Sequence, residues 1–334
     1  MSPHEPARTR TNRMTEPIDM NPTPQSDNAP ADPSGLIRAF DADGREVLIT
    51  RDEWRDKVLP GAIEQRWNDA DALAALIIQS LNDDFIDDMV GPAERLVQLD
   101  QNTERAVVLQ AIVYLKQGRL DDSERVLTDF CARHGDTGIV LTNLAKVHAE
   151  RGDDDKTLDT LWRALQRDPN QDNGLGWYEA IHRDVGGDAA GVGAMQRVAA
   201  LPGSWRARLW LARGELGAHN YAGALALYRE ALAQAGEPVP GDLLMQMTGD
   251  LGNAGRIPDI VQLAAPHYRA AVHGPQVGNN LIKAYLLLGQ PDPARHILDA
   301  LHALGQPEWK EHLAYWDAEL ARLQAQRGAS GSAP

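Results

Sequence analysis

Residues Gly138 to Asn170 read GIVLTNLAKVHAERGDDDKTLDTLWRALQRDPN, and this stretch decides the fold. Apolar side chains recur every three or four residues before Gly152, and the same spacing restarts after it. Such spacing places the apolar residues on one face of a helix. Gly152 can adopt the left-handed backbone that ends a helix, and Asp168-Pro169 ends the second one. The stretch therefore predicts two amphipathic helices that meet at a glycine.

The helix-glycine-helix unit recurs at a fixed period. Gly118 precedes Gly152 by 34 residues, and Gly255 precedes Gly289 by the same interval. A period of this length indicates a solenoid, in which each hairpin buries its apolar face only by stacking on its neighbours. A chain of 334 residues built in this way can form one continuous, elongated body.

These residues resemble the tetratricopeptide repeat (TPR) family. The packing positions, the turn glycine and the closing D-P-N of the family are matched by Leu141, Leu144, Ala145, His148, Gly152, Leu161, Ala164 and Asp168-Pro169-Asn170. His148 stands where a tyrosine is usual, and Thr157 stands where a small alanine is usual. The resemblance implies an all-α fold, a right-handed α-solenoid of about seven TPR-like hairpins. Their predicted starts are Ala70, Glu104, Gly138, Asp172, Trp205, Gly241 and Pro275.

Both ends of the array carry predicted capping elements. Residues 36–40 and 45–49 flank a loop with Gly44 and predict a small N-terminal β-hairpin. Thr50 and Glu53 form a capping box that begins a helix. The hairpin caps the solenoid or, alternatively, offers an edge strand to a partner. A calcium loop at Asp41 and Asp43 is disfavoured because both anchoring acids are missing. The predicted organisation is a disordered tail at 1–35, the β-hairpin with its capping helix at 36–69, the solenoid at 70–308, a C-terminal capping helix at 309–327 and a flexible tail at 328–334.

Composition excludes several classes of function. Lys and Arg number 33 against 48 Asp and Glu, so the net charge is -15. A strongly acidic chain is a poor general binder of nucleic acid or of anionic membranes, which need clustered cations. Cys131 is the only cysteine, so no intramolecular disulfide can form. A single cysteine fits a reducing compartment, and the first residues lack the apolar core of a secretory signal. No apolar run approaches the ~20 residues of a spanning helix. We therefore expect a cytoplasmic protein without membrane insertion.

No catalytic or metal-binding motif emerges from the spacing of reactive residues. The chain lacks G-x-S-x-G, H-E-x-x-H and the P-loop. Cys131 and His134 lie three residues apart, but two ligands do not make a zinc site. His148 and His182 hold the same place in successive units and are interpreted as core residues. We therefore predict a protein that is not an enzyme and has no cofactor and no metal, with an enzyme as the less favoured class.

Function is then expected on the surface. In TPR-like arrays the first helix of each hairpin lines a concave groove, and this implication of the resemblance selects polar and aromatic residues in the middle of the chain. Arg and Trp dominate binding hot spots, and Asn can hydrogen-bond a peptide backbone in both directions. We expect an adaptor or scaffold that binds a protein or peptide with acidic and apolar residues. The predicted partner-binding residues are Asn143, Lys146, Asn173, Trp177, Arg183, Arg206, Trp210 and Arg213.

Three alternatives stay open from the sequence. The chaperone-tail clamp of some TPR proteins agrees with Asn143, but Val108 and Ile112 occupy the places of its lysine and asparagine in the preceding unit. Trp177 and Trp210 can instead pack between adjacent hairpins. A ligand- or peptide-sensing regulatory protein is the other function class, with the glycine-rich stretch 186–193 as its hinge.

Overall fold

The stretch from Gly138 to Asn170 folds as the predicted helical hairpin in the computed structural model, which describes residues 36–40 and 45–330. α7 (Gly138–Glu150) is followed by Gly152, whose φ of 76° lies in the left-handed region. Asp153 Oδ1 accepts the Lys156 N–H at 3.1 Å and so caps the start of α8 (Asp154–Arg167). The helix-glycine-helix prediction is confirmed.

The chain divides after Leu99 into two compact units. The first unit begins with β1 (Leu36–Phe40) and β2 (Glu46–Thr50), which pair antiparallel with Leu36 opposite Thr50. The loop between the strands, where the calcium alternative falls, lies outside the described residues, as do the predicted tail at 1–35 and residues 331–334. The helices of this unit are α1 (Arg51–Lys57), α2 (Leu59–Arg66), α3 (Ala70–Asn82), the 3-10 helix η1 (Asp87–Met89) and α4 (Val90–Leu99).

The capping box at Thr50 is confirmed. Thr50 Oγ1 accepts the Glu53 N–H at 3.2 Å, and Glu53 Oε2 accepts the Thr50 N–H at 3.2 Å. α1 then packs on the first hairpin, because the ring of Trp54 stacks on that of Phe85 with centroids 4.7 Å apart. Arg55 Nε also donates to Asp88 Oδ2 at 2.9 Å. Aromatic stacking and this ion pair attach α1 to the segment that joins α3 to α4.

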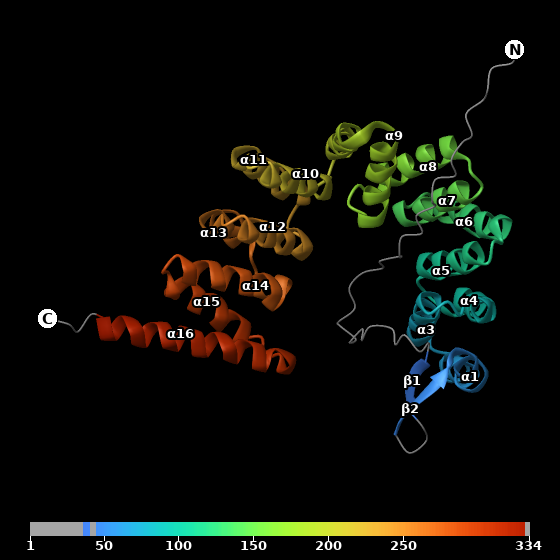
Figure 1. The fold of residues 1–334 in the computed structure, drawn as a ribbon, viewed down its shortest axis with the longest axis horizontal. Helices are drawn as coiled ribbons and strands as arrows, with labels where there is room; N and C mark the ends of the chain where they lie inside the picture. Colours follow the sequence, from blue (N-terminus) through green and yellow to red (C-terminus); the bar gives the residue numbers. More distant parts are fainter. Residues whose placement is uncertain (1–35, 41–44, 331–334) are drawn as a thin grey trace, which may run out of the picture. The chain divides into compact units, whose positions relative to one another are not determined.

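In the described part of the second unit, six helical hairpins follow one another in chain order, and each packs on the next (Figure 1). The predicted α-solenoid is confirmed. Its helices, besides α7 and α8, are α5 (Thr103–Lys116), α6 (Leu120–His134), α9 (Asp172–Ala199), α10 (Arg206–Gly217), α11 (Tyr221–Ala235), α12 (Gly241–Asn253), α13 (Ile257–Ala264), η2 (Ala265–His267), α14 (Ala270–Leu287), α15 (Pro291–His302), η3 (Pro307–Trp309) and α16 (Lys310–Ser330).

α9 contains a complete hairpin within one named helix. Its backbone reverses at Gly187, with φ 75° and ψ -175°, one residue after Gly186, which lies one 34-residue period beyond Gly152. The two arms approach closely, since a Cβ on Gly191 would lie 2.5 Å from Glu179 Oε1. A larger residue at Gly191 would therefore have to displace the end of the Glu179 side chain.

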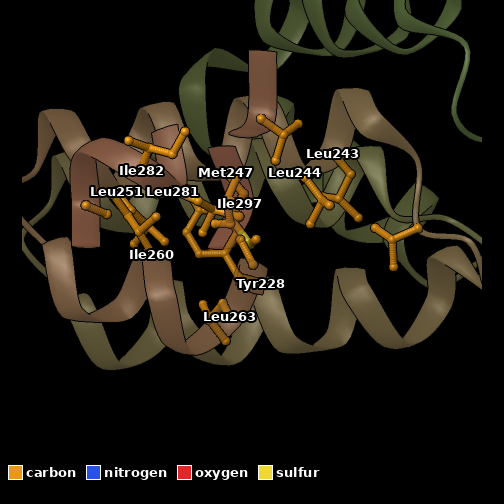
Figure 2. Close-up of a cluster of buried hydrophobic side chains, with 14 of the residues drawn as sticks. Tyr228, Leu243, Leu244, Met247, Leu251, Ile260, Leu263, Leu281, Ile282 and Ile297 are labelled. Atoms are coloured by element: carbon orange, nitrogen blue, oxygen red, sulfur yellow. The ribbon is translucent and has the colours of Figure 1, made fainter. Parts of the chain in front are cut away.

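The core of the second unit is continuous across the hairpin boundaries. One buried cluster extends from Trp205 to Leu320, and a second extends from Ala145 to Ala207. Figure 2 shows the first cluster around Met247, where side chains of four successive helices and Tyr228 meet. The C-terminal helix covers this core with its buried Leu313, Trp316 and Leu320, as predicted, and continues past the predicted end at 327 to Ser330.

Candidate partner-binding surface

The predicted binding residues lie on α7, α9 and α10, three successive first helices of hairpins. We call the side chains that α5, α7, α9, α10, α12 and α14 leave outside the core the first-helix surface. α7 carries two of the predicted residues, and α9 and α10 carry three each. α9 and α10 pack directly on one another. The surface thus gathers residues from hairpins that are separate in the sequence.

Both predicted tryptophans are half-buried and take part in packing. Trp210 lies against both of the clusters described above, and Trp177 lies against the one that includes Leu175. A Cβ on Gly176 would lie 3.3 Å from the Trp210 ring, so glycine at this place lets the ring lie on α9. The packing interpretation of the tryptophans is therefore correct for Trp210, which keeps part of its ring at the surface.

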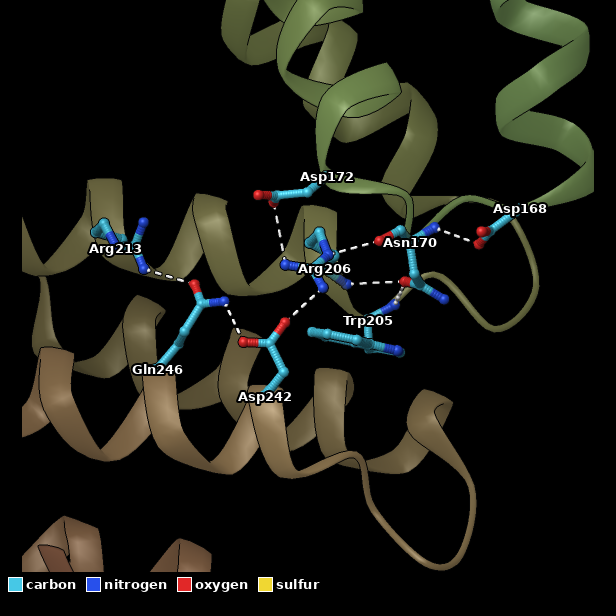
Figure 3. Close-up of polar contacts among 8 residues, drawn as sticks. All are labelled: Asp168, Asn170, Asp172, Trp205, Arg206, Arg213, Asp242 and Gln246. Carbon is cyan, nitrogen blue, oxygen red and sulfur yellow. Dashed lines mark hydrogen bonds and ion pairs between the residues drawn. The ribbon is translucent and has the colours of Figure 1, made fainter. Parts of the chain in front are cut away.

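Arg206 is held by the chain's own groups from three hairpins (Figure 3). Its Nε donates to the Asn170 carbonyl oxygen at 2.6 Å, and its Nη1 donates to Asp172 at 3.0 Å. Nη2 pairs with Asp242, and the guanidinium lies 4.6 Å from the Trp205 ring centroid. The side chain is 12% exposed. Arg206 therefore joins α9, α10 and α12 structurally.

The other two arginines are also paired with carboxylates. Arg213 Nε contacts the two oxygens of Asp250 at 3.0 and 3.1 Å, and its Nη2 donates to Gln246 at 3.0 Å. Arg183 pairs with Glu179 and, at 3.6 Å, with Asp188. The cations that the sequence suggested for ligand contacts are thus largely neutralised within the array.

Asn170 has a role that the sequence interpretation missed. Its Oδ1 accepts the backbone N–H groups of Trp205 and Arg206 at 2.9 and 3.0 Å, and its Nδ2 donates to the Gly203 carbonyl at 2.9 Å. The closing Asn of one unit therefore fixes the start of the helix one repeat later. The sequence feature that could have revealed this contact is the 34-residue period, because Asn170 and Ser204 are one period apart and fall on adjacent units.

The polar side chains of α7 differ from these arginines, because no ion pair to a carboxylate is found for them among the described residues. Thr142 Oγ1 donates to Gln171 at 2.6 Å, and Asn143 Nδ2 donates to the Ile139 carbonyl at 2.9 Å. Burial lowers the pKa of the Lys146 ammonium, and the nearby charge of Lys116 lowers it further. This part of the first-helix surface holds cations without a neighbouring carboxylate among the described residues.

Farther along, the polar residues mostly bond one another. Gln246 Nε2 donates to Asp242 at 2.7 Å, Asn280 Nδ2 donates to Thr248 at 2.8 Å, and Asn279 Oδ1 accepts from the Trp316 indole at 2.8 Å. Asn173, the remaining predicted residue, is exposed at the start of α9 and has a polar or ring contact of its own. Exposed side chains at this end of the surface are Met245 and Lys283.

The reactive residues outside this surface have structural surroundings. Burial, with the charge of Asp136, raises the pKa of the Cys131 thiol to about 11. The ring of His134 contacts Phe130 with centroids 4.8 Å apart, and His148 is buried. Within residues 36–40 and 45–330, no three His, Cys, Asp or Glu side chains lie close enough to hold a metal ion.

A hollow of about 400 Å³ lies at the turn between α5 and α6. Arg151 lines it and pairs with Asp121 at 2.6 Å, while Arg119 pairs with Asp122 at 2.6 Å. None of the predicted partner-binding residues lines it.

Among the helices of the described residues, none is long and apolar enough to cross a membrane.

Comparison with models of known protein families and with curated proteins gives no match. Solved structures do match. A TPR protein from Parabacteroides merdae is 15% identical, over 76% of this chain and 98% of its own, with a TM-score of 0.31. A TPR protein from Thermus thermophilus is 20% identical, over 55% of this chain and 98% of its own, with a TM-score of 0.33. Yeast Tom70 is 11% identical, over 83% of this chain and 57% of its own, with a TM-score of 0.40. These likenesses concern the fold alone.

Proposed function

We propose that this TPR-like chain is a non-enzymatic interaction adaptor or scaffold that binds a peptide or partner segment along the first-helix surface. The observation that carries the proposal is a pair of firmly held, partly exposed hot-spot side chains on α10. Trp210 is held by two hydrophobic clusters, and Arg213 is held by Asp250 and Gln246. Side chains already fixed in the free protein lose little entropy on binding, so their contacts contribute more to affinity.

The neighbouring helix extends this surface with an apolar side chain. Met245 of α12 is 40% exposed, and the adjacent Gln246 is hydrogen-bonded to Arg213. A methionine adapts its shape to different apolar groups. We infer a partner segment that places an apolar residue at Met245 and Trp210. The net charge of -15 supports a protein partner over nucleic acid, and a cytoplasmic location remains part of the proposal.

The test must avoid residues that hold the core. Trp210→Ala would empty space in both clusters, so lost binding could reflect damage to the fold. Met245→Glu instead places a charge on an exposed position of the same surface. Its control is Leu287→Glu, because Leu287 is 62% exposed at the end of α14.

Binding is measured by fluorescence anisotropy with a library of blocked ten-residue peptides on the full chain. For the peptides that bind wild type, we expect Met245→Glu to lower the affinity about tenfold. Leu287→Glu should bind them with the wild-type affinity. Helical circular dichroism and melting should stay unchanged in both variants. Equal affinity of wild type and Met245→Glu would contradict the proposal for this surface.

A further inference from the structure

The β-hairpin of the first unit is a sheet of only two strands. β1 and β2 pair with each other (Figure 1), and the sheet has no third strand in the part of the chain that the structure describes. A two-stranded sheet is marginally stable in water, and three or more strands are needed for independent stability. The outer edge of each strand also carries backbone N–H and C=O groups that the hairpin itself does not pair. A further strand would therefore complete this sheet.

The direction of the backbone groups of β2 follows from its last residue. Thr50 stands opposite Leu36 in the register, but it donates its N–H to Glu53 Oε2 at 3.2 Å, within the capping box. Along an antiparallel strand, the groups that face the partner strand alternate with those that face away from it. Leu48 lies two residues before Thr50, so its N–H and C=O also face away from β1. They point to the open edge of β2.

β2 lacks the features that usually protect an open edge. Its sequence EVLIT contains no lysine and no proline. Its register with β1 is one to one over all five residues, so no bulge twists the edge away. Natural edge strands are commonly protected by one of these features. Leu48, in the middle of the strand, is 53% exposed. An exposed leucine at the centre of such an edge favours pairing with another strand.

The strand is complementary to itself about Leu48. When two copies of β2 run antiparallel with Leu48 opposite Leu48, Val47 of each copy stands opposite Ile49 of the other. The two Leu48 residues then exchange two backbone hydrogen bonds, and their side chains become cross-strand neighbours. Val47 and Ile49, which are half-buried in the hairpin, extend the opposite face of the sheet from one copy to the other. The apolar pattern and the free backbone groups thus agree on one register.

β1 does not offer the same match. Its middle residue is Arg38. An antiparallel pair of β1 strands about that position would set two like charges directly opposite each other, which is destabilising. The edge of β2 is therefore the one suited to self-pairing, and the charged middle position of β1 suits an edge that stays open.

We propose that two copies of the chain associate through antiparallel pairing of β2 about Leu48, which joins the two hairpins into one four-stranded sheet. The interface is isologous, and the edges that remain are those of β1, so association ends at the dimer. The pairing does not depend on the scaffold function, but it adds to it. A dimer presents two copies of the first-helix surface, so a partner with two binding segments is held with avidity.

The first test is sedimentation velocity on the full chain. So short a pair of strands makes a small interface, and we expect a dissociation constant on the order of 10 µM. Wild type should therefore change from monomer to dimer between roughly 1 and 100 µM. Leu48→Lys should stay monomeric, because two ammonium groups would face each other at the centre of the pair. Val58→Lys is the matched control, since Val58 is 38% exposed between α1 and α2 of the same unit. It adds the same charge and should dimerise as wild type does.

A mixing experiment separates pairing from damage to the hairpin. Leu48→Lys and Leu48→Glu should each be monomeric when alone, because each sets like charges opposite each other. An equal mixture of the two variants should associate, because opposite charges then meet at the same place. A variant with a disrupted hairpin would not recover in this way. Failure of the mixture to associate would refute the register about Leu48.

Hydrogen exchange followed by nuclear magnetic resonance tests the backbone geometry. The Ile49 amide faces β1 and should be protected at every concentration, whereas the Leu48 amide should become protected only as the dimer forms. In Leu48→Lys the Ile49 amide should stay protected, which shows that the hairpin is intact.

Three outcomes would overturn the proposal. The first is a wild type that is still monomeric at about 100 µM. The second is a Leu48→Lys variant that dimerises as well as wild type, because the interface would then lie elsewhere. The third is a monomeric wild type with a protected Leu48 amide, because a segment of the same chain would then occupy the edge. None of these results bears on peptide binding, so the scaffold function is tested separately by the anisotropy measurements.

Discussion

Arg206→Met removes the cation that joins α9, α10 and α12 while keeping an unbranched side chain of comparable reach. The largest loss is the hydrogen bond from Arg206 Nε to the Asn170 carbonyl, 2.6 Å long. A hydrogen bond to a charged group contributes about 1.5–3 kcal/mol. The ion pairs to Asp172 and Asp242 add only about 0.5–1 kcal/mol, because both carboxylates are partly exposed and screened. The junction should therefore lose about 3 kcal/mol.

Hydrogen exchange measured by mass spectrometry resolves this loss along the chain. Stability in a repeat array is a sum of repeat and interface contributions, so the effect should concentrate in α10 and in the facing parts of α9 and α12. A loss of about 3 kcal/mol corresponds to exchange about 100-fold faster in these helices. The helices α5 to α7 should exchange nearly as in wild type.

Arg213→Met provides the control on the same helix. Arg213 is 49% exposed and pairs with Asp250 at the surface, so its loss should change exchange by less than about fivefold. If Arg206→Met changes exchange in α10 no more than Arg213→Met does, the structural role assigned to Arg206 is refuted. The arginine would then be free to serve as the partner contact that the sequence suggested.

Two further predictions concern titratable groups. Because the pKa of Cys131 is raised to about 11, its thiolate fraction at pH 8 should be about 100-fold below that of a free cysteine, and iodoacetamide should react correspondingly slowly until the chain is unfolded. Partial burial raises the pKa of Asp317, but hydrogen bonds from Arg295 and His302 outweigh it and lower the pKa overall. The carboxylate therefore stabilises the attachment of α16 above the unfolded pKa of roughly 4, and that stabilisation is lost as the pH falls through the lower folded value. Asp317→Asn should remove this contribution to the pH dependence of hydrogen exchange in α16, and an unchanged dependence would contradict the assignment.

The local elements could be predicted because their causes are local. The turn at Gly152, the capping box at Thr50 and the apolar face of α16 each depend on residues within a few positions of one another. The 34-residue period points to Gly186 for the turn of α9, but Gly187 is adjacent, and only the backbone geometry shows that Gly187 reverses the chain.

The contacts that the candidate site residues make within the chain could not be predicted in the same way. The helix positions of the arginines follow from the period. Whether a carboxylate compensates their charge depends on the residues that face them from the neighbouring hairpin. Arg206 meets carboxylates 34 and 36 residues away, and Arg213 meets one 37 residues away. Trp210 likewise packs on α9 because the residue opposite its ring is Gly176. Contacts across units therefore decide how much of each side chain stays exposed to a partner.

This pairing gives the repeat period a second use. In a stacked array, residues one period apart lie on adjacent hairpins, so a charge can be judged by its neighbours about 34 positions before and after it. Arg206 has Asp172 before it and Asp242 after it, and it is neutralised. Lys146 has Ile112 before it and Ala180 after it, and among the described residues no carboxylate reaches it. The same residue class thus has different surroundings within one surface: a cation between acids holds the array together, whereas Lys146, between apolar residues, gains no such partner among the described residues.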